Sequence, residues 1–98
     1  MCVYVDPLVT CLPTTRWRWT RVSHLLADTP EELHTFAARL DLKREWFQLG
    51  SLPHYDLTPN KRVQAVLLGV VDLLSWEMVR EVHQRLHARF PPSGRHII

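Results

Sequence analysis

Cysteine and glycine are scarce in this sequence, which has two cysteines and three glycines among its 98 residues. Cys2 and Cys11 are too few for the disulfide framework that holds many small secreted domains together. Neither belongs to a CxxC pair, so a zinc site built from paired thiolates is excluded. With so few glycines the chain also has no Gly-rich phosphate loop and no dinucleotide-binding fingerprint. The glycine-dependent nucleotide-binding folds are therefore ruled out.

Long hydrophobic runs and a strong excess of charge are also missing. No apolar stretch approaches the roughly 18 residues that cross a membrane, and the N-terminus lacks the pattern of a signal peptide. The 12 Lys and Arg residues nearly balance the 10 Asp and Glu residues, and a net charge of +2 is too weak to argue for nucleic acid. We therefore expect a reduced, cytoplasmic protein with no membrane partner, for which nucleic acid is an alternative ligand but not the favoured one.

The residues that are present describe one small folded protein. Hydrophobic residues make up 46% of the chain and charged residues 22%, which is ordinary for a globular domain. The consecutive prolines Pro91 and Pro92 end the last helical pattern. We expect a single domain over residues 1–90 and a tail over residues 91–98. The six histidines and four tryptophans are the unusual part of the composition.

The spacing of apolar residues predicts strands that alternate with helices. Thr29-Pro30 and Thr58-Pro59 each join a capping threonine to a proline at the first helical position, and Gly69 fits a helix C-cap. The expected strands cover residues 2–5, 16–27 and 70–74, the helices 30–40, 59–68 and 75–90, a helical turn 43–48, and loops 7–13 and 51–56. This order predicts an α/β or α+β protein, with a single-layer sheet of about three or four short strands and three helices packed on it.

Asp6, His24 and Asp28 form the first candidate site. Asp6 ends the first expected strand, and Asp28 ends the second just before a helix. If the two strands run parallel, their carboxyl ends meet at one edge, where ligand sites of open α/β sheets lie. Two carboxylates and an imidazole would then hold a divalent metal ion. The alternative is that each aspartate caps a turn or the following helix.

The second candidate site lies at the start of the second expected helix. His54, Tyr55 and Asp56 precede this helix, and its first turn carries Lys61 and Arg62. Free N–H groups at a helix N-terminus, together with two cations, suit an anionic ligand. The alternative is that Asp56 forms a surface ion pair with Lys61 or Arg62, which contributes about 0–1 kcal/mol.

Two further patterns favour a structural role. Arginine and tryptophan alternate from Arg16 to Arg21, which would allow base stacking, but strict alternation is what a strand that turns its tryptophans to the core predicts. His83 and His87 lie one helical turn apart, as a metal-binding pair does, but no pattern for a third ligand accompanies them. We interpret both as structural. His34, beside the buried stripe of its helix, is expected to face the strand edge near Asp6, and Trp46 and Gln48 are expected to line the same cleft.

Several short motifs occur together in a characteristic order. They are Val3-Tyr4-Val5-Asp6, Ser23-His24-Leu25-Leu26-Ala27-Asp28-Thr29, Glu32-Leu33-His34, Phe36-Ala37, Trp46-Phe47-Gln48, His54-Tyr55-Asp56-Leu57-Thr58, Lys61-Arg62, Ala65 and Gly69. Over about residues 1–76 the chain resembles a family of small bacterial and phage proteins, domain of unknown function 4031. That family usually has a second acidic residue where this chain has Pro7. The resemblance implies a frequent setting in phages and the same polar residues as the two candidate sites, but it implies no reaction.

The leading hypothesis is a module that binds an anionic ligand, a nucleotide or phosphate, in one polar cleft, with a role in phage counter-defence. The expected ligand-binding residues are Asp6, His24, His34, His54, Tyr55, Asp56, Lys61 and Arg62. A divalent metal is the expected cofactor if there is one, with Asp6, His24 and Asp28 as its candidate ligands.

Two other functions stay open. One is a metal-dependent phosphoryl or nucleic-acid hydrolase, in which His24, His54 or Asp56 is catalytic. The other is an inhibitor or adaptor that binds a host or defence protein through the basic, Trp-containing surface. The sequence favours binding over catalysis, and four tryptophans on a thin core favour a homodimer.

Overall fold

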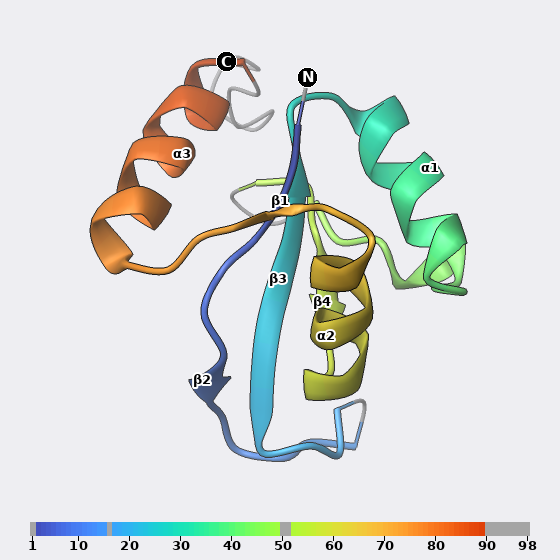
Figure 1. The fold of residues 1–98 in the computed structure, drawn as a ribbon. Helices are drawn as coiled ribbons and strands as arrows, with labels where there is room; N and C mark the ends of the chain where they lie inside the picture. Colours follow the sequence, from blue (N-terminus) through green and yellow to red (C-terminus); the bar gives the residue numbers. More distant parts are fainter. Residues whose placement is uncertain (1, 16, 50–51, 90–98) are drawn as a thin grey trace, which may run out of the picture.

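The computed structural model describes residues 2–15, 17–49 and 52–89, which form an α+β fold (Figure 1). The strands of this part of the chain are β1 (Val3–Val5), β2 (Val9–Thr10), β3 (Arg21–Ala27), β4 (Tyr55–Leu57) and β5 (Val71–Asp72). Its helices are α1 (Pro30–Arg39), α2 (Pro59–Leu67) and α3 (Trp76–Arg89), and a short 3-10 helix spans Arg44–Trp46. The predicted fold class, a small sheet with three helices, is confirmed.

β3 is the central strand of the sheet. Leu25 of β3 pairs with Val5 of β1 and with Tyr55 of β4, both in antiparallel register, so β1 and β4 lie on opposite edges of β3. β2 pairs with the beginning of β3, and β5 pairs in parallel with β1. Side chains from two strands that are distant in sequence therefore flank the middle of β3.

The alternation of side chains gives the sheet two different faces. Val5, Leu25 and Tyr55 point to one face and pack with residues of α1 and α2 in a first apolar core. Tyr4 and Leu26 point to the opposite face and pack with α3 in a second core. Figure 1 shows the same layering, with α3 on one side of the strands and α1 and α2 on the other. The sheet thus separates anything on the α3 face from anything on the α1/α2 face.

The helix ends follow the predicted signals. Thr29 caps α1 by accepting a hydrogen bond from the backbone N–H of Glu32 at 3.2 Å. Thr58 caps α2 in the same way, accepting from the N–H of Lys61 at 3.2 Å. Gly69 follows α2 with φ +96°, a left-handed conformation that a residue with a Cβ adopts only at a cost.

The strand predictions were wrong in three places. The strand expected from residue 16 begins only at Arg21, because residues 17–20 form an irregular loop; residue 16 lies outside the described residues. In that loop Trp17 and Trp19 contact one another, with ring centroids 4.9 Å apart, and Trp19 is 45% exposed. The loops expected at 7–13 and 51–56 contain β2 and most of β4, which are too short to show a clear sequence period.

The helix predictions need one correction. Ala65 is buried in α2, but Val63 and Leu67, which were expected in its buried stripe, are exposed. In α3 the predicted apolar stripe is confirmed for Val79, Val82 and Leu86. Phe90 and the tail at 91–98 lie outside the described residues. Within the described residues, no helix is long and apolar enough to cross a membrane.

Candidate metal-binding site

The polar residues of the site come from the α3 face of β3 and β4. His24 and Asp56 are direct partners in the antiparallel register, so both side chains leave the same face of the sheet. His54 precedes Asp56 by two residues and extends the same row. Their neighbours Leu25, Tyr55 and Leu57 alternate to the opposite face and are buried there. The strand period therefore aims two imidazoles and one carboxylate at a single point.

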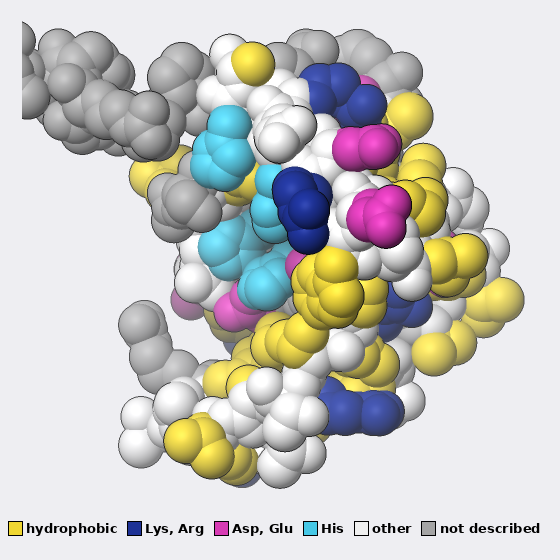
Figure 2. All heavy atoms as spheres, turned by 90° about the vertical axis from the view of Figure 1, so that its left-hand side faces the viewer, with side chains coloured by type: hydrophobic (Ala, Val, Ile, Leu, Met, Phe, Trp, Pro, Cys, Tyr) yellow, Lys and Arg dark blue, Asp and Glu magenta, His cyan; other side chains and the backbone are white. Residues whose placement is uncertain are grey.

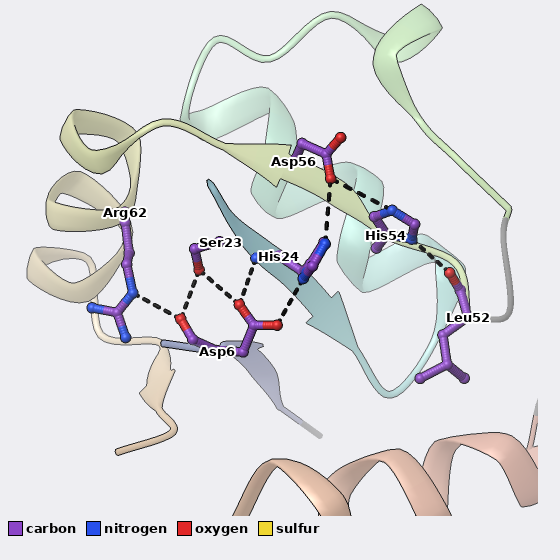
Figure 3. Close-up of polar contacts among 7 residues, drawn as sticks. All are labelled: Asp6, Ser23, His24, Leu52, His54, Asp56 and Arg62. Atoms are coloured by element: carbon purple, nitrogen blue, oxygen red, sulfur yellow. Dashed lines mark hydrogen bonds and ion pairs between the residues drawn. The ribbon is translucent and has the colours of Figure 1, made fainter. Parts of the chain in front are cut away.

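A buried aspartate orients the His24 ring (Figure 3). Asp6 follows β1, is 4% exposed, and places Oδ2 at 2.7 Å from Nδ1 of His24. Its Oδ1 accepts hydrogen bonds from the His24 backbone N–H at 2.7 Å and from the Ser23 hydroxyl at 3.0 Å. The Asp6 carbonyl accepts from Ser23 and from Nε of Arg62, at 2.7 and 2.8 Å. These contacts hold both Asp6 and the ring that it faces in one position.

The electrostatics of this pair favour its charged form. The hydrogen bond to Asp6 raises the pKa of His24; burial opposes this shift, and the charges of Asp6 and Asp56 add to it. Burial acts to raise the pKa of Asp6, but the hydrogen bonds from the ring and backbone of His24 outweigh it and lower the pKa. Asp6 is therefore an ionised acceptor, and the His24 proton that faces it lies on Nδ1.

His54 is oriented by a backbone carbonyl instead of a carboxylate. Its Nδ1 lies 2.7 Å from the carbonyl oxygen of Leu52, which can only accept, so Nδ1 donates. Asp56 is held by Gln48, whose Nε2 donates to Oδ2 at 2.6 Å and leaves Oδ1 free to face the rings. Gln48 is itself placed by a backbone bridge to His54, with reciprocal hydrogen bonds of 2.9 Å.

The three side chains converge on one point that suits a cation. The Nε2 atoms of His24 and His54 each lie 3.6 Å from Oδ1 of Asp56 (Figure 3), too far for a good hydrogen bond. One donor atom from each of the three residues lies within 4.8 Å of the other two. When both rings are neutral and carry their proton on Nδ1, two Nε2 lone pairs face a carboxylate oxygen. Positive charge between these atoms, either a bound metal ion or a proton on Nε2, makes that arrangement favourable.

The donor set indicates the kind of ion. Ligands about 2.1 Å from one ion at a tetrahedral angle are separated by about 3.4 Å, close to the observed 3.6 Å. Imidazole nitrogen suits zinc, iron and similar ions more than magnesium or calcium, which prefer oxygen. Metal-bound histidines usually donate their other nitrogen to a carboxylate or carbonyl, and Asp6 and Leu52 supply such acceptors here. The residues therefore fit a divalent transition metal.

The first predicted metal site was based on a wrong strand direction. β1 and β3 are antiparallel, with Val3 opposite Ala27, so Asp6 and Asp28 lie at opposite ends of the pair. Asp28 accepts hydrogen bonds from the backbone N–H of Cys2 and the hydroxyl of Tyr4, both at 2.9 Å. Of Asp6, His24 and Asp28, only His24 belongs to the group that converges with His54 and Asp56. Asp6 contacts the other nitrogen of the His24 ring and orients it.

The residues that were expected to line one cleft lie on two opposite faces of the sheet. Tyr55 points to the α1/α2 face, where its hydroxyl lies 2.8 Å from Nδ1 of His34. His34 therefore does not face Asp6, as predicted, but packs beside Tyr55 and Phe47. Lys61 donates from Nζ to the carbonyl of Leu40 at 2.6 Å.

Arg62 is engaged as well, through Asp6 and through an ion pair with Asp72. At the start of α2, Arg62 is therefore paired with a carboxylate, and Lys61 is directed toward a backbone carbonyl of the protein. Asp56 shows neither of the two ion pairs that were considered for it, since its described partners are Gln48, His24 and His54.

Sequence reasoning missed two of the groups that orient the site. Ser23 and the carbonyl of Leu52 carry no sequence signal, because serine is common in strands and every residue has a backbone oxygen. Asp6 and Gln48 were expected in the cleft, but their hydrogen bonds to His24 and Asp56 were not predicted. His83 was interpreted as structural, yet its pKa is affected by Asp6 and His24 across the α3 face.

The fold and the site together define a small α+β protein with a histidine-carboxylate cluster on one face of its sheet. A family model described as Protein of unknown function (DUF4031) matches residues 3–85, and the chain belongs to this family. No match was found among curated proteins or solved structures.

Proposed function

We propose that the protein binds one divalent transition-metal ion through His24, His54 and Asp56, and that this ion holds an anionic ligand. The convergence of both Nε2 atoms on Oδ1 of Asp56, at 3.6 Å each, carries the proposal. Two neutral imidazoles and one carboxylate leave an M²⁺ ion with a net charge of +1. Three protein ligands also leave coordination positions open, as they do in catalytic metal sites.

In this proposal the metal ion binds the anionic ligand, a role for which the sequence suggested Lys61 and Arg62. Lys61 donates to the Leu40 carbonyl, and Arg62 donates to the Asp6 carbonyl and forms an ion pair with Asp72. An anion on the α3 face would meet the negative side chains of Asp6 and Asp56, which repel it. A bound divalent ion neutralises these two charges and offers open coordination positions to the anion, so ligand binding depends on metal.

Hydrolysis of a phosphate ester is the second candidate function. The observation that favours it is the partial exposure of the site, since the His24 side chain is 38% exposed and solvent can reach the open positions. A water molecule bound to such an ion loses a proton near neutral pH and becomes a nucleophile. Turnover distinguishes this function from simple binding.

The test measures metal affinity by isothermal titration calorimetry of the metal-free protein with Zn²⁺, Co²⁺ and Mg²⁺. We expect one Zn²⁺ per chain, Co²⁺ binding with visible absorption bands, and much weaker binding of Mg²⁺. Asp56→Asn keeps the shape of the side chain and removes its charge, and should weaken Zn²⁺ binding by about 100-fold or more. His34→Gln is the matched control, because His34 lies on the other face of the sheet. Equal Zn²⁺ affinity in D56N and the wild type would reject the site.

An adaptor function has a separate observation in its favour. Exposed apolar side chains extend over α2, β5 and the start of α3, with Leu67 80%, Leu74 77% and Trp76 53% exposed. Such a surface suits a protein partner, either a host or defence protein or a second copy of the chain. This differs from the basic Trp-containing loop that the sequence suggested. Sedimentation of the wild type and of Leu74→Ser with Trp76→Ser tests the homodimer.

Counter-defence is the biological setting that we propose on the basis of the resemblance to phage proteins. A metal-bound anion site would there bind a small phosphorylated signal of the host in the cytoplasm. A phage carrying D56N in this gene should then lose protection in hosts whose defence uses such a signal.

A further inference from the structure

Two histidines of α3 lie on the same face of the sheet as the proposed metal site. His83 and His87 are one helical turn apart, are both half-buried, and have ring centroids 6.3 Å apart in an edge-to-face arrangement. The apolar stripe of α3, formed by Val79, Val82 and Leu86, is buried against the sheet. The histidines therefore follow the edge of this stripe, where the helix meets the polar part of the sheet.

The packing of α3 on Tyr4 and Leu26 places His83 on the same face of the sheet as the site. Burial lowers the pKa of His83, the charge of Asp6 acts to raise it, and His87 and His24 act to lower it. Figure 2, which views the α3 side of the molecule, shows histidine side chains gathered into one patch. Imidazoles from the sheet and from α3 therefore share one surface.

His83 and His87 do not form a metal site with any other described residue. Among the described residues, the one group with three ligand atoms close enough for a metal ion is His24, His54 and Asp56. Two imidazoles without a third ligand make a poor metal site. A half-buried imidazole N–H beside an anion-binding metal is, however, a good hydrogen-bond donor.

We propose that His83 and His87 bind the outer oxygens of a phosphate group whose inner oxygen is held by the metal. This inference rests on the proposed function, because the metal provides the first point of attachment. A metal and two donors on successive helical turns make three points, which require a ligand with at least three acceptor oxygens. A tetrahedral oxyanion such as a phosphate monoester has them, whereas a carboxylate has only two. The ligand class is therefore a phosphate monoester.

The experiment compares methyl phosphate with acetate on the zinc-loaded protein, by calorimetry. The variant His83→Ala with His87→Ala, which removes both side-chain donors, should bind methyl phosphate at least 10-fold more weakly than the wild type and bind acetate equally well. Its Zn²⁺ affinity should not change, because neither residue is a ligand. Gln84→Ala, an exposed change on the same helix, should leave all three affinities as they are, and each single histidine variant should show part of the loss.

Other outcomes separate this inference from the function on which it rests. If the wild type binds Zn²⁺ but methyl phosphate binds no more tightly than acetate, the phosphate site is rejected and the metal site stands. The phosphate site is likewise rejected if the double variant binds methyl phosphate like the wild type. If the wild type does not bind Zn²⁺, both proposals are rejected. Circular dichroism of each variant confirms that the comparison is between folded proteins.

Discussion

The two faces of the sheet each carry a histidine with a polar partner, but the two pairs differ in character. On the α3 face, His24 faces the carboxylate of Asp6, and this hydrogen bond raises its pKa. On the α1/α2 face, His34 meets the hydroxyl of Tyr55 beside Phe47, and burial followed by the charge of Arg44 lowers its pKa. The Asp6 carboxylate holds the Nδ1 proton of His24 and stabilises positive charge on or next to the ring, whereas the apolar surroundings of His34 favour the neutral ring. The first pair therefore suits function and the second suits packing.

The largest expected effect concerns the packing face. Leu57 of β4 is fully buried in the α1/α2 core, so Leu57→Ala leaves a cavity and should lower the free energy of unfolding by about 2–5 kcal/mol. Chemical denaturation followed by circular dichroism measures this change. Leu67→Ala is the matched control, because Leu67 is largely exposed and should change stability by less than about 0.5 kcal/mol. Similar losses in both variants would contradict the assigned core.

The next effect concerns the functional face. Asp6 does not touch the proposed ion, but it orients His24, so Asp6→Asn should weaken Zn²⁺ binding by about 10–100-fold. Asp41→Asn is a suitable control, since Asp41 is exposed and has φ 59°, which asparagine also tolerates. Titration of both variants with Zn²⁺ gives the comparison. Unchanged affinity in D6N would mean that the carboxylate has no role in presenting the ring.

A smaller effect tests whether the two faces are separate. Tyr55→Phe removes the hydroxyl that contacts His34 and should lower the free energy of unfolding by about 0.5–1.5 kcal/mol. Zn²⁺ affinity should stay the same, although Tyr55 lies between His54 and Asp56 in sequence. A tenfold loss of Zn²⁺ affinity in Y55F would show that the faces are coupled through β4.

The smallest effect is a difference in titration between the two histidines of the metal-free protein. NMR should give His24 a pKa above the ordinary value of about 6.5 and His34 a pKa below it. While the lowered pKa of Asp6 contributes stability that is lost in acid, the raised pKa of His24 should contribute stability that is present below about pH 6.5 and is lost as pH rises through its folded pKa.

His34 behaves in the opposite way, with a contribution present above about pH 6.5 and lost as pH falls through its folded pKa. Asp6→Asn should return the His24 pKa toward its ordinary value and leave that of His34 alone. Equal pKa values for the two rings would remove the contrast between the faces.

Local signals predicted those features whose cause is local. Thr29 and Thr58 cap helices because their hydroxyls reach a backbone N–H three residues on, and Gly69 takes a left-handed φ at the end of α2. The identity of the polar residues was also visible, since the sequence alone marks His24, His54 and Asp56 as candidates. They were also expected to share one cleft, together with several other residues. Their pairing across β3 and β4 as three possible metal ligands was not predicted, because β4 is three residues long and most of it was expected to be a loop.

What the sequence determined by itself was the set of helices, the fold class and the list of chemically active side chains. Strand direction and register were decided only by the tertiary structure, because both depend on which chain segments collapse together. The antiparallel pairing of β1 with β3 separates Asp6 from Asp28, and the pairing of β3 with β4 sets His24 opposite Asp56. A shift of one residue in that register would place Tyr55 on the α3 face and bury Asp56. The burial of Leu25, Tyr55 and Leu57 on the opposite face therefore sets the register that brings the proposed metal ligands together.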